Sequence, residues 1–244
     1  MTNEQTIEKL YDLKLGAMAE AFRESLSRAQ ETQLSFAERF GLLVDREWTR
    51  REENRLTRRL KTARLRVSAS IEEVDFTTPR GLDREVFLAL AGGRYLKEHH
   101  NVIICGATGL GKTYLACALA DKACRDGFSA RYCRLPRLCF ELALARADGS
   151  YLKLLTQLAK TDLLILDDWG IAPLEGQAQH DLLEVIDDRA QSHSTLVASQ
   201  VPPGEWHQLF ADPTVADAVL DRLLHNAARI DLKGGSMRKK TATV

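Results

Sequence analysis

The sequence predicts an α/β protein whose parallel sheet is flanked by helices, preceded by a small all-helical N-terminal domain. From about residue 83 onward, short apolar segments alternate with helical ones, which is typical of a parallel sheet covered on both faces. Residues 1 to about 66 show helical periodicity alone, and no proline occurs before Pro79. A glycine-rich segment between an apolar strand and a helix is the third observation.

The N-terminal region divides into three expected helices. Its apolar residues recur at helical spacing in two groups, which are Leu10, Leu13, Met18, Phe22 and Leu26, and then Phe36, Phe40 and Leu43. Ser35 and Glu38 form a candidate capping box for the second helix, and the charged segment that follows continues as a third. Ser, Thr and Pro replace the charges near residues 68–79. We therefore predict a helical domain over 1–67, a linker over 68–82 and a second domain over 83–244.

The second domain alternates as a parallel fold requires. Strands are expected at 102–105, 130–133, 163–166 and 195–199, because these segments are short and almost entirely apolar. Helices are expected at 112–125, 135–147, 151–160 and 181–192, and in much of the remainder. The basic C-terminal tail is expected to fray.

The glycine-rich segment fits the pattern G-x-x-x-x-G-K-[ST]. It reads Gly106-Ala107-Thr108-Gly109-Leu110-Gly111-Lys112-Thr113 and is followed by Tyr114. Glycines let backbone N–H groups wrap phosphates, and a helix N-terminus adds positive potential there. Lys112 is expected to reach the β- and γ-phosphates, and the Thr113 hydroxyl to bind Mg²⁺. The alternative is a glycine-rich turn without a ligand.

Two strand ends carry further candidates for nucleotide hydrolysis. Asp167 ends an apolar strand, where a carboxylate can hold Mg²⁺, and Asp168 follows it and can polarise the attacking water. Alternatively, both carboxylates cap the next turn. Gln200 or Ser199, after a strand expected beside the strand at 102–105, can orient that water, or can form a turn before Pro202.

Arg222 and Arg238 are candidates for stabilising charge on a phosphate. A guanidinium offers a planar fork of donors, either within one chain or from a neighbouring subunit. Each arginine can equally be an ordinary surface residue. Their order after the glycine-rich segment favours the functional interpretation.

Composition excludes several classes of protein. The chain has 244 residues, a hydrophobic fraction of 45% and a formal net charge of zero. No apolar run approaches the ~20 residues of a membrane span, and the polar N-terminus is unlike a signal peptide. The five cysteines show no metal-binding spacing and are expected to be reduced packing residues. We therefore expect a cytoplasmic protein with no membrane partner.

The neutral net charge conceals a basic segment. Nine cations, including Arg55, Arg58 and Arg59, face three glutamates between residues 46 and 66. Such a segment can follow a phosphate backbone, remain a solvated helix face, or dock on an acidic protein surface. Trp48 beside it is expected in a helical core rather than stacked on bases. No base-reading motif is present, so DNA binding is expected to be largely independent of sequence.

Several segments together resemble the AAA+ ATPases of the IstB/DnaC type. These are residues 106–113, 163–168, 199–200, 221–222 and 236–238. Three more resemble the IstB family in particular: Tyr132-Cys133-Arg134-Leu135-Pro136-Arg137-Leu138, Ala147-Asp148-Gly149-Ser150-Tyr151 and Leu166-Asp167-Asp168-Trp169-Gly170. The resemblance covers essentially the whole chain. IstB proteins are ATP-binding helpers encoded beside the transposase of a class of bacterial insertion sequences.

The resemblance assigns roles to these positions. It implies an AAA+ P-loop fold with ATP and Mg²⁺ as cofactors, in which Lys112 and Thr113 belong to Walker A. Asp167 and Asp168 would form Walker B, although many AAA+ enzymes have Glu at the second position. Gln200, or Ser199, would be the first sensor. Arg222 would be an arginine finger offered to the adjacent subunit, and Arg238 the second sensor.

The same resemblance implies partners and a function. The helical pair at 135–160 resembles the insert that makes this clade assemble as spirals. The resemblance places DNA inside the spiral, so it implies that DNA contacts Arg134, Arg137, Arg146 and Lys153. The expected protein is an ATPase that assembles as a homo-oligomer, a spiral or a ring, on duplex DNA and recruits a transposase, with hydrolysis driving disassembly. A DnaC-like helicase loader and a small-molecule P-loop kinase are the alternatives.

Overall fold

The computed structural model of the chain describes residues 2–27 and 34–237. Contacts between residues divide the chain into two compact units, Met1–Arg58 and Arg59–Val244. The expected division into a helical domain, a linker and a second domain, with boundaries at 67/68 and 82/83, stays a prediction.

The first unit consists of helices, with boundaries that differ from the expected ones. These are α1 (Asn3–Asp12), α2 (Gly16–Ser27) and α3 (Phe36–Ala63), which continues into the second unit. The single helix expected from Leu10 to Leu26 is wrong, because Leu13 caps α1 and Lys14 adopts a positive φ of 59°. The second and third expected helices are one continuous helix. The Ser35–Glu38 capping box at its start is confirmed, since the Glu38 amide donates to Ser35 Oγ over 3.3 Å.

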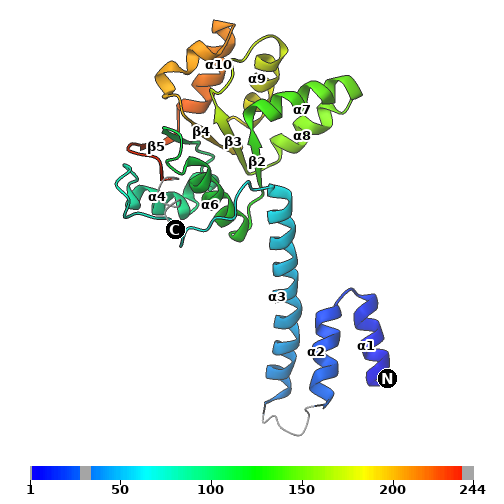
Figure 1. Cartoon of the computed structure of the whole chain (residues 1–244). Coiled ribbons are helices and arrows are strands. Elements are labelled where there is room, and N and C mark those ends of the chain that lie inside the picture. The colour runs from blue at the N-terminus through cyan, green and yellow to red at the C-terminus, as the bar shows by residue number, and fades with distance from the viewer. Residues whose placement is uncertain (1, 28–33, 238–244) are drawn as a thin grey trace, which may run out of the picture. The chain divides into compact units, whose positions relative to one another are not determined.

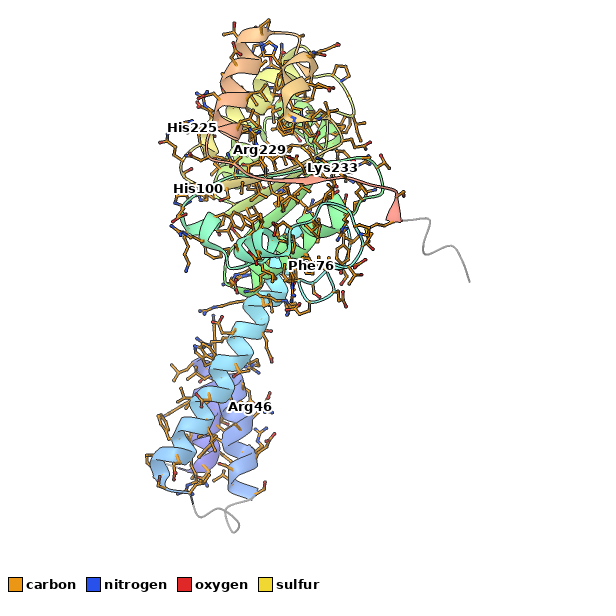
Figure 2. All side chains as sticks on the ribbon, turned by 90° about the vertical axis from the view of Figure 1, so that its left-hand side faces the viewer. Arg46, Phe76, His100, His225, Arg229 and Lys233 are labelled. Atoms are coloured by element: carbon orange, nitrogen blue, oxygen red, sulfur yellow. The ribbon has the colours of Figure 1, made fainter. Side chains whose placement is uncertain are left out.

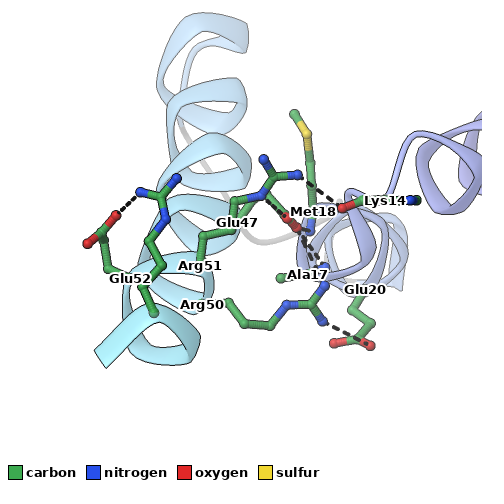
Figure 3. Close-up of polar contacts among 9 residues, drawn as sticks. Lys14, Ala17, Met18, Glu20, Glu47, Arg50, Arg51 and Glu52 are labelled. Atoms are coloured by element: carbon green, nitrogen blue, oxygen red, sulfur yellow. Dashed lines mark hydrogen bonds and ion pairs between the residues drawn. The ribbon is translucent and has the colours of Figure 1, made fainter. Parts of the chain in front are cut away.

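A buried glutamate joins α2 to α3 within the first unit (Figure 3). Glu47 on α3 accepts hydrogen bonds from the amides of Ala17 and Met18 over 2.9 and 3.2 Å, at the start of α2. Helix N-termini leave amides without partners, so this carboxylate satisfies two of them. Burial alone would raise the pKa of Glu47. The hydrogen bonds from Arg51 and the two amides have the larger combined effect, so the pKa lies below its usual value.

The second unit contains a five-stranded parallel sheet in the order β2-β3-β4-β1-β5 (Figure 1). The strands are β1 (Val102–Gly106), β2 (Ala130–Arg134), β3 (Leu163–Trp169), β4 (Ser194–Ser199) and β5 (Ala228–Leu232). The four expected strands are confirmed. The position of β4 beside β1 agrees with the expectation as well.

The fifth strand was not expected, because its pattern is weak. In β5 the apolar residues Ile230 and Leu232 alternate with charged ones, as befits an edge strand with one neighbour. Figure 2 shows Arg229 and Lys233 along this edge, with His225 near the end where the strand begins. β5 pairs with β1 up to Gly106, so it brings the residues that follow it to the glycine-rich loop.

Helices cover both faces of the sheet, as predicted. α6 (Lys112–Arg125) contacts β1 to β4 on one face, and α4 (Arg84–Ala91) packs against it, with the short α5 (Arg94–Lys97) next in the chain. The other face forms one core with α7 (Leu135–Asp148), α8 (Tyr151–Ala159), α9 (Gln177–Arg189), α10 (Pro213–Leu224) and the 3₁₀ helix η1 (Pro203–Leu209). Alternating strand residues serve the two faces.

One helix differs clearly from its expected bounds. α9 runs from Gln177 to Arg189 rather than over 181–192. Gly176, with a positive φ of 53°, precedes the helix, and the extended Ala190 followed by Gln191 at φ 61° ends it. The turns at Gly176 and Gln191 therefore place both ends of α9 earlier in the chain than the apolar pattern predicted.

Candidate functional site

The glycine-rich loop connects the end of β1 to the start of α6. Gly109 and Gly111 both have φ of +87°, a region that side chains rarely adopt. A Cβ at Gly109 would lie 2.1 Å from Ser236 Oγ, and one at Gly111 would lie 2.6 Å from an Arg80 nitrogen. Backbone conformation therefore favours glycine at both positions, and at Gly109 the close approach of Ser236 leaves no room for a Cβ as well. The loop has the shape that a backbone cradle for phosphate needs.

Lys112 begins α6 and lies over the loop. Its side chain is buried, and Nζ donates to the carbonyls of Gly106 and Ala107 over 2.6 and 2.9 Å. These hydrogen bonds hold the ammonium group at the mouth of the cradle. A phosphate bound there would meet this charge directly.

A hydroxyl and a carboxylate meet beside the lysine. Thr113 Oγ1 donates to Asp167 Oδ2 over 2.7 Å, and the Tyr132 hydroxyl donates to the same oxygen over 2.7 Å. Asp167 is almost completely buried. Burial first, and the bond to Asp167 second, raise the pKa of Tyr132, so the phenol stays a donor. Nothing in the sequence singled out Tyr132 for this position.

Asp168 is held in an unusual backbone conformation. Its φ is +62°, and the pairing of β3 with β4 shifts register between Leu166 and Trp169. Its amide donates to Asp167 Oδ1 over 2.8 Å, while its carboxylate accepts from Arg134 Nε and lies 3.7 Å from an Arg66 nitrogen. Such backbone strain persists where the surroundings impose it, often at functional sites.

Gln200 and Ser199 occupy different environments. Gln200 Oε1 accepts a 2.6 Å hydrogen bond from Thr108 Oγ1 and lines the cleft above the loop. Ser199 is fully buried, and its hydroxyl bonds the carbonyls of Trp169 and Val201 over 2.9 and 2.8 Å. Of the two, Gln200 has the side chain that a nucleotide can reach.

One cleft of about 670 Å³, within the range of ligand pockets, is lined by Thr108, Gly109, Gly111, Lys112, Thr113, Asp167, Asp168 and Gln200. Glu73, Asp75 and Arg80, from the expected linker, line it too, together with Tyr114 and Met237. The Tyr114 hydroxyl donates to Glu73 over 3.2 Å. The segment at 68–82 therefore forms part of the wall of the cleft.

Arg80 is a cleft residue that no pattern in the sequence singles out. It is buried, and its guanidinium donates to the carbonyls of Leu110 and Asp75, each over 2.8 Å. Its Nε has no hydrogen-bond partner among the described residues. Burial lowers the pKa of Arg80. The residue before Arg238 also reaches the loop, since the Met237 amide donates to Gly109 O over 2.9 Å, but Arg238 itself lies outside the described residues.

Other predicted residues lie away from the cleft or are engaged elsewhere. Arg222 on α10 is not among the described residues that line the cleft, and its Nε donates to Asp187 over 2.6 Å. Arg146 donates to the buried Asp181 through Nε and Nη2 over 2.8 and 2.5 Å, which connects α7 to α9. Lys153 is exposed on α8.

The basic segment falls partly in each unit. Arg55 and Arg58 belong to the first, and Arg59 to the second. Arg55 is paired with Glu52, while Arg50 and Arg51 contact Glu20 and Glu47. Acidic neighbours thus compensate part of its charge. Trp48 is well exposed, so its expected place in a helical core is not what the structure shows.

The residues present fit a magnesium nucleotide. Thr113 and Asp167 offer hard oxygen atoms, which Mg²⁺ prefers, beside an ammonium group and a glycine cradle for phosphate. Within residues 2–27 and 34–237 no group of three or more His, Cys, Asp or Glu side chains is arranged to hold a metal ion. The ion's other ligands would therefore come from phosphate and water. In the same described residues, no helix is long and apolar enough to cross a membrane.

Comparisons with known proteins agree with this geometry. The family described as IstB-like ATP binding protein matches residues 8–244. An insertion sequence ATP-binding protein, y4pL, of Sinorhizobium fredii is 51% identical over 96% of both chains. The ATP-binding protein of insertion sequence IS1162 from Pseudomonas fluorescens is 49% identical over 83% of this chain and 88% of its own.

Among solved structures, DnaI superposes with a TM-score of 0.59 at 22% identity, covering 69% of this chain and 92% of its own. This likeness concerns the fold, which is that of AAA+ P-loop ATPases. The family match covers nearly the whole sequence, the glycine-rich loop and the Asp167 strand end included. The chain therefore belongs to the IstB-like ATP-binding proteins of insertion sequences, and it is an ATPase.

Proposed function

We propose that this ATPase assembles on duplex DNA in its ATP-bound state and recruits a transposase for transposition of an insertion sequence. The observation that carries the proposal is the convergence of Lys112, Thr113, Asp167 and Asp168 on one cleft, in a chain whose relatives are insertion sequence ATP-binding proteins. Hydrolysis would then release the protein from DNA.

Binding is assigned to the loop at 106–113 and to Tyr114 beside it. The backbone amides and Lys112 would hold the phosphates, and Thr113 and Asp167 would hold Mg²⁺, which neutralises phosphate charge when bound. Tyr132 donates to Asp167 and so keeps its carboxylate oriented toward Thr113. Arg80 braces the loop through Leu110.

Hydrolysis is assigned to the residues around Asp168. Asp168 would accept a proton from the attacking water, and Gln200 would orient that water, because both side chains line the same cleft. Arg222 is proposed to act on the nucleotide of a neighbouring subunit, and Arg238 within its own. The trans role requires assembly before hydrolysis.

DNA is proposed as the partner on the basis of charge and family. Arg134 and Arg137 are half-exposed and exposed on the second unit, and they offer guanidinium groups for backbone phosphates. Arg146 is less suited, because Asp181 occupies its guanidinium group. With interactions to phosphate alone, binding would be largely independent of sequence.

The two alternative functions receive less support. The relatives that span nearly the whole chain are insertion sequence proteins, whereas the likeness to DnaI and DnaC shows fold alone. A small-molecule kinase would turn over as a dilute monomer, indifferent to DNA. Turnover that rises with protein concentration and with duplex DNA would exclude that alternative.

The test is electron microscopy of the full chain with duplex DNA in ATP and in ADP. We expect ordered assemblies on DNA with ATP and none with ADP. Lys112→Ala should form none in either nucleotide, while Lys97→Ala, which removes an exposed lysine on α5, should behave as wild type. A wild-type protein that remains a single particle with saturating ATP and DNA would refute the proposal.

A further inference from the structure

A second cavity lies next to the nucleotide cleft, entirely within the second unit, and arginines dominate its wall. Its volume is about 310 Å³. Five arginines line it, Arg64, Arg66, Arg131, Arg134 and Arg137, and Glu141 is the one carboxylate among the described residues of its lining. They come from the segment that follows α3, from β2 and from α7, so the fold brings together arginines that are far apart in the sequence.

The carboxylates nearby do not balance this charge. Glu141 pairs with both Arg131 and Arg137, over 3.3 and 3.2 Å, and Asp168 pairs with Arg66 and Arg134. Two carboxylates therefore face five guanidinium groups. Arg64 forms no ion pair with any carboxylate in the described part of the chain. Clustered like charges destabilise a fold unless a counter-charge joins them, so the cavity is suited to a multivalent anion.

The wall is open to a large ligand. The side chains of Arg134 and Arg137 are 50% and 77% exposed, whereas that of Arg131 is only 16% exposed. The exposed guanidinium groups lie at the rim and the more buried one lies deeper, so a phosphate on a large polymer can reach them from solvent. Guanidinium forks match phosphate oxygens in pairs.

We propose that this cavity, which we call the arginine pocket, binds a backbone phosphate of duplex DNA. The inference rests on the proposed function for the identity of the polymer. It adds the site of interaction and Arg131, which the sequence did not indicate, and it selects Arg64 and Arg66 from the basic segment at residues 46–66. Phosphate is the chemistry that five guanidinium groups recognise.

The arginine pocket shares two residues with the nucleotide cleft. Arg66 and Arg134 line both cavities, and both lie against the Asp168 carboxylate. A phosphate in the pocket therefore competes with Asp168 for the same two guanidinium groups. DNA binding should in consequence alter ATP turnover through Asp168.

The experiment measures binding of the full chain to a fluorescently labelled duplex with a non-hydrolysable ATP analogue, as a function of salt. The test variant is Arg64→Gln/Arg137→Gln, since both side chains are exposed and neither contacts Asp168. The matched control is Arg94→Gln/Lys97→Gln on α5, which removes the same charge from the same unit.

We expect the affinity of the test variant for the duplex to fall on the order of tenfold for each guanidinium–phosphate interaction that the substitutions remove. The slope of log affinity against log salt should fall by about one for each such interaction. The control and the charge-keeping Arg64→Lys/Arg137→Lys variant should keep the wild-type slope. ATP turnover of the test variant should no longer respond to duplex DNA.

Several results separate the possibilities. If the test variant binds DNA as wild type does, the pocket assignment is wrong while DNA binding itself stands. If wild type binds no DNA, the proposed function fails first. Inorganic phosphate at constant ionic strength should displace DNA from wild type. Phosphate that binds the pocket without displacing DNA would assign the pocket to free phosphate and overturn the proposal.

Discussion

At the scale of single residues, Asp168 combines an unusual backbone conformation with contacts to two arginines of the cleft. A positive φ of 62° is uncommon outside glycine, but Asp and Asn tolerate it better than other side chains. The strained backbone presents the carboxylate to the cleft, where Arg134 and Arg66 lie against it. A carboxylate placed in this way can accept a proton from the attacking water, and a substitution tests that proposed role directly.

Asp168→Asn is the suitable substitution, because Asn keeps both the size of the side chain and its tolerance of the left-handed region. ATP binding should remain, while turnover should fall by about a hundredfold or more, as expected when a general base is removed. Phosphate release and the equilibrium binding of a fluorescent ATP analogue measure the two. Glu98→Gln on the surface serves as control. Normal turnover in Asp168→Asn would show that the proton goes elsewhere.

At the scale of elements, one buried arginine joins the helices to the sheet. Arg189 at the end of α9 is 1% exposed and has no carboxylate partner among the described residues. Its guanidinium donates to the carbonyls of Leu158, Thr161 (2.7 Å) and Ser194 (2.6 Å). Burial lowers its pKa to about 10. The charge is tolerated because it satisfies carbonyls at the end of α8, in the turn that follows it and at the start of β4.

Arg189→Met should destabilise the second unit by about 3 kcal/mol, because buried carbonyls would be left without charged donors. Urea unfolding followed by tryptophan fluorescence measures this, in a Trp48→Phe background so that the buried Trp169 and Trp206 report on this unit alone. The control Arg125→Met removes a surface ion pair on α6 and should change stability by less than about 0.5 kcal/mol. Equal midpoints for both variants would contradict the structural role of Arg189.

At the scale of the whole molecule, the proposed hydrolysis depends on assembly. Arg222 lies on α10, is paired with Asp187, and does not line the cleft of its own chain in the described residues. Its proposed role therefore requires the cleft of another subunit. In the single chain, Arg222 is paired with Asp187. Partly exposed ion pairs contribute little stability, so a neighbouring nucleotide could draw Arg222 away from Asp187 at small cost.

A mixing experiment tests this role. Arg222→Ala alone should lower turnover on the order of 10³-fold, the effect of removing an arginine finger. Mixed with Asp168→Asn subunits, which bind ATP and still carry Arg222, its turnover should partly recover. Asp187→Ala, which releases Arg222 without removing it, should stay near wild type. Failure of the mixture to recover would place Arg222 outside the neighbouring site.

Much of the second unit could be predicted from the sequence. Its three central strands, β1, β3 and β4, are mostly apolar because helices cover both faces of the sheet, and such runs are easy to recognise. The glycine-rich loop was equally easy to recognise, because its function needs glycine at fixed positions. Gly109 and Gly111 have the positive φ angles that explain this need. The edge strand β5 and the break after α1 were missed, since neither has a strong periodic signal.

The sequence by itself determined the alternation of β1 to β4 with helices, the phosphate-binding loop and the carboxylates at the end of β3, because these depend on local periodicity and on residue types at fixed spacing. The tertiary structure alone decided that Arg80 lines the cleft and that Tyr132 donates to Asp167. It also decided that arginines from β2, α7 and the segment after α3 line one pocket. Those neighbours are far apart in the chain, and a parallel sheet with its crossover helices is what brings them together.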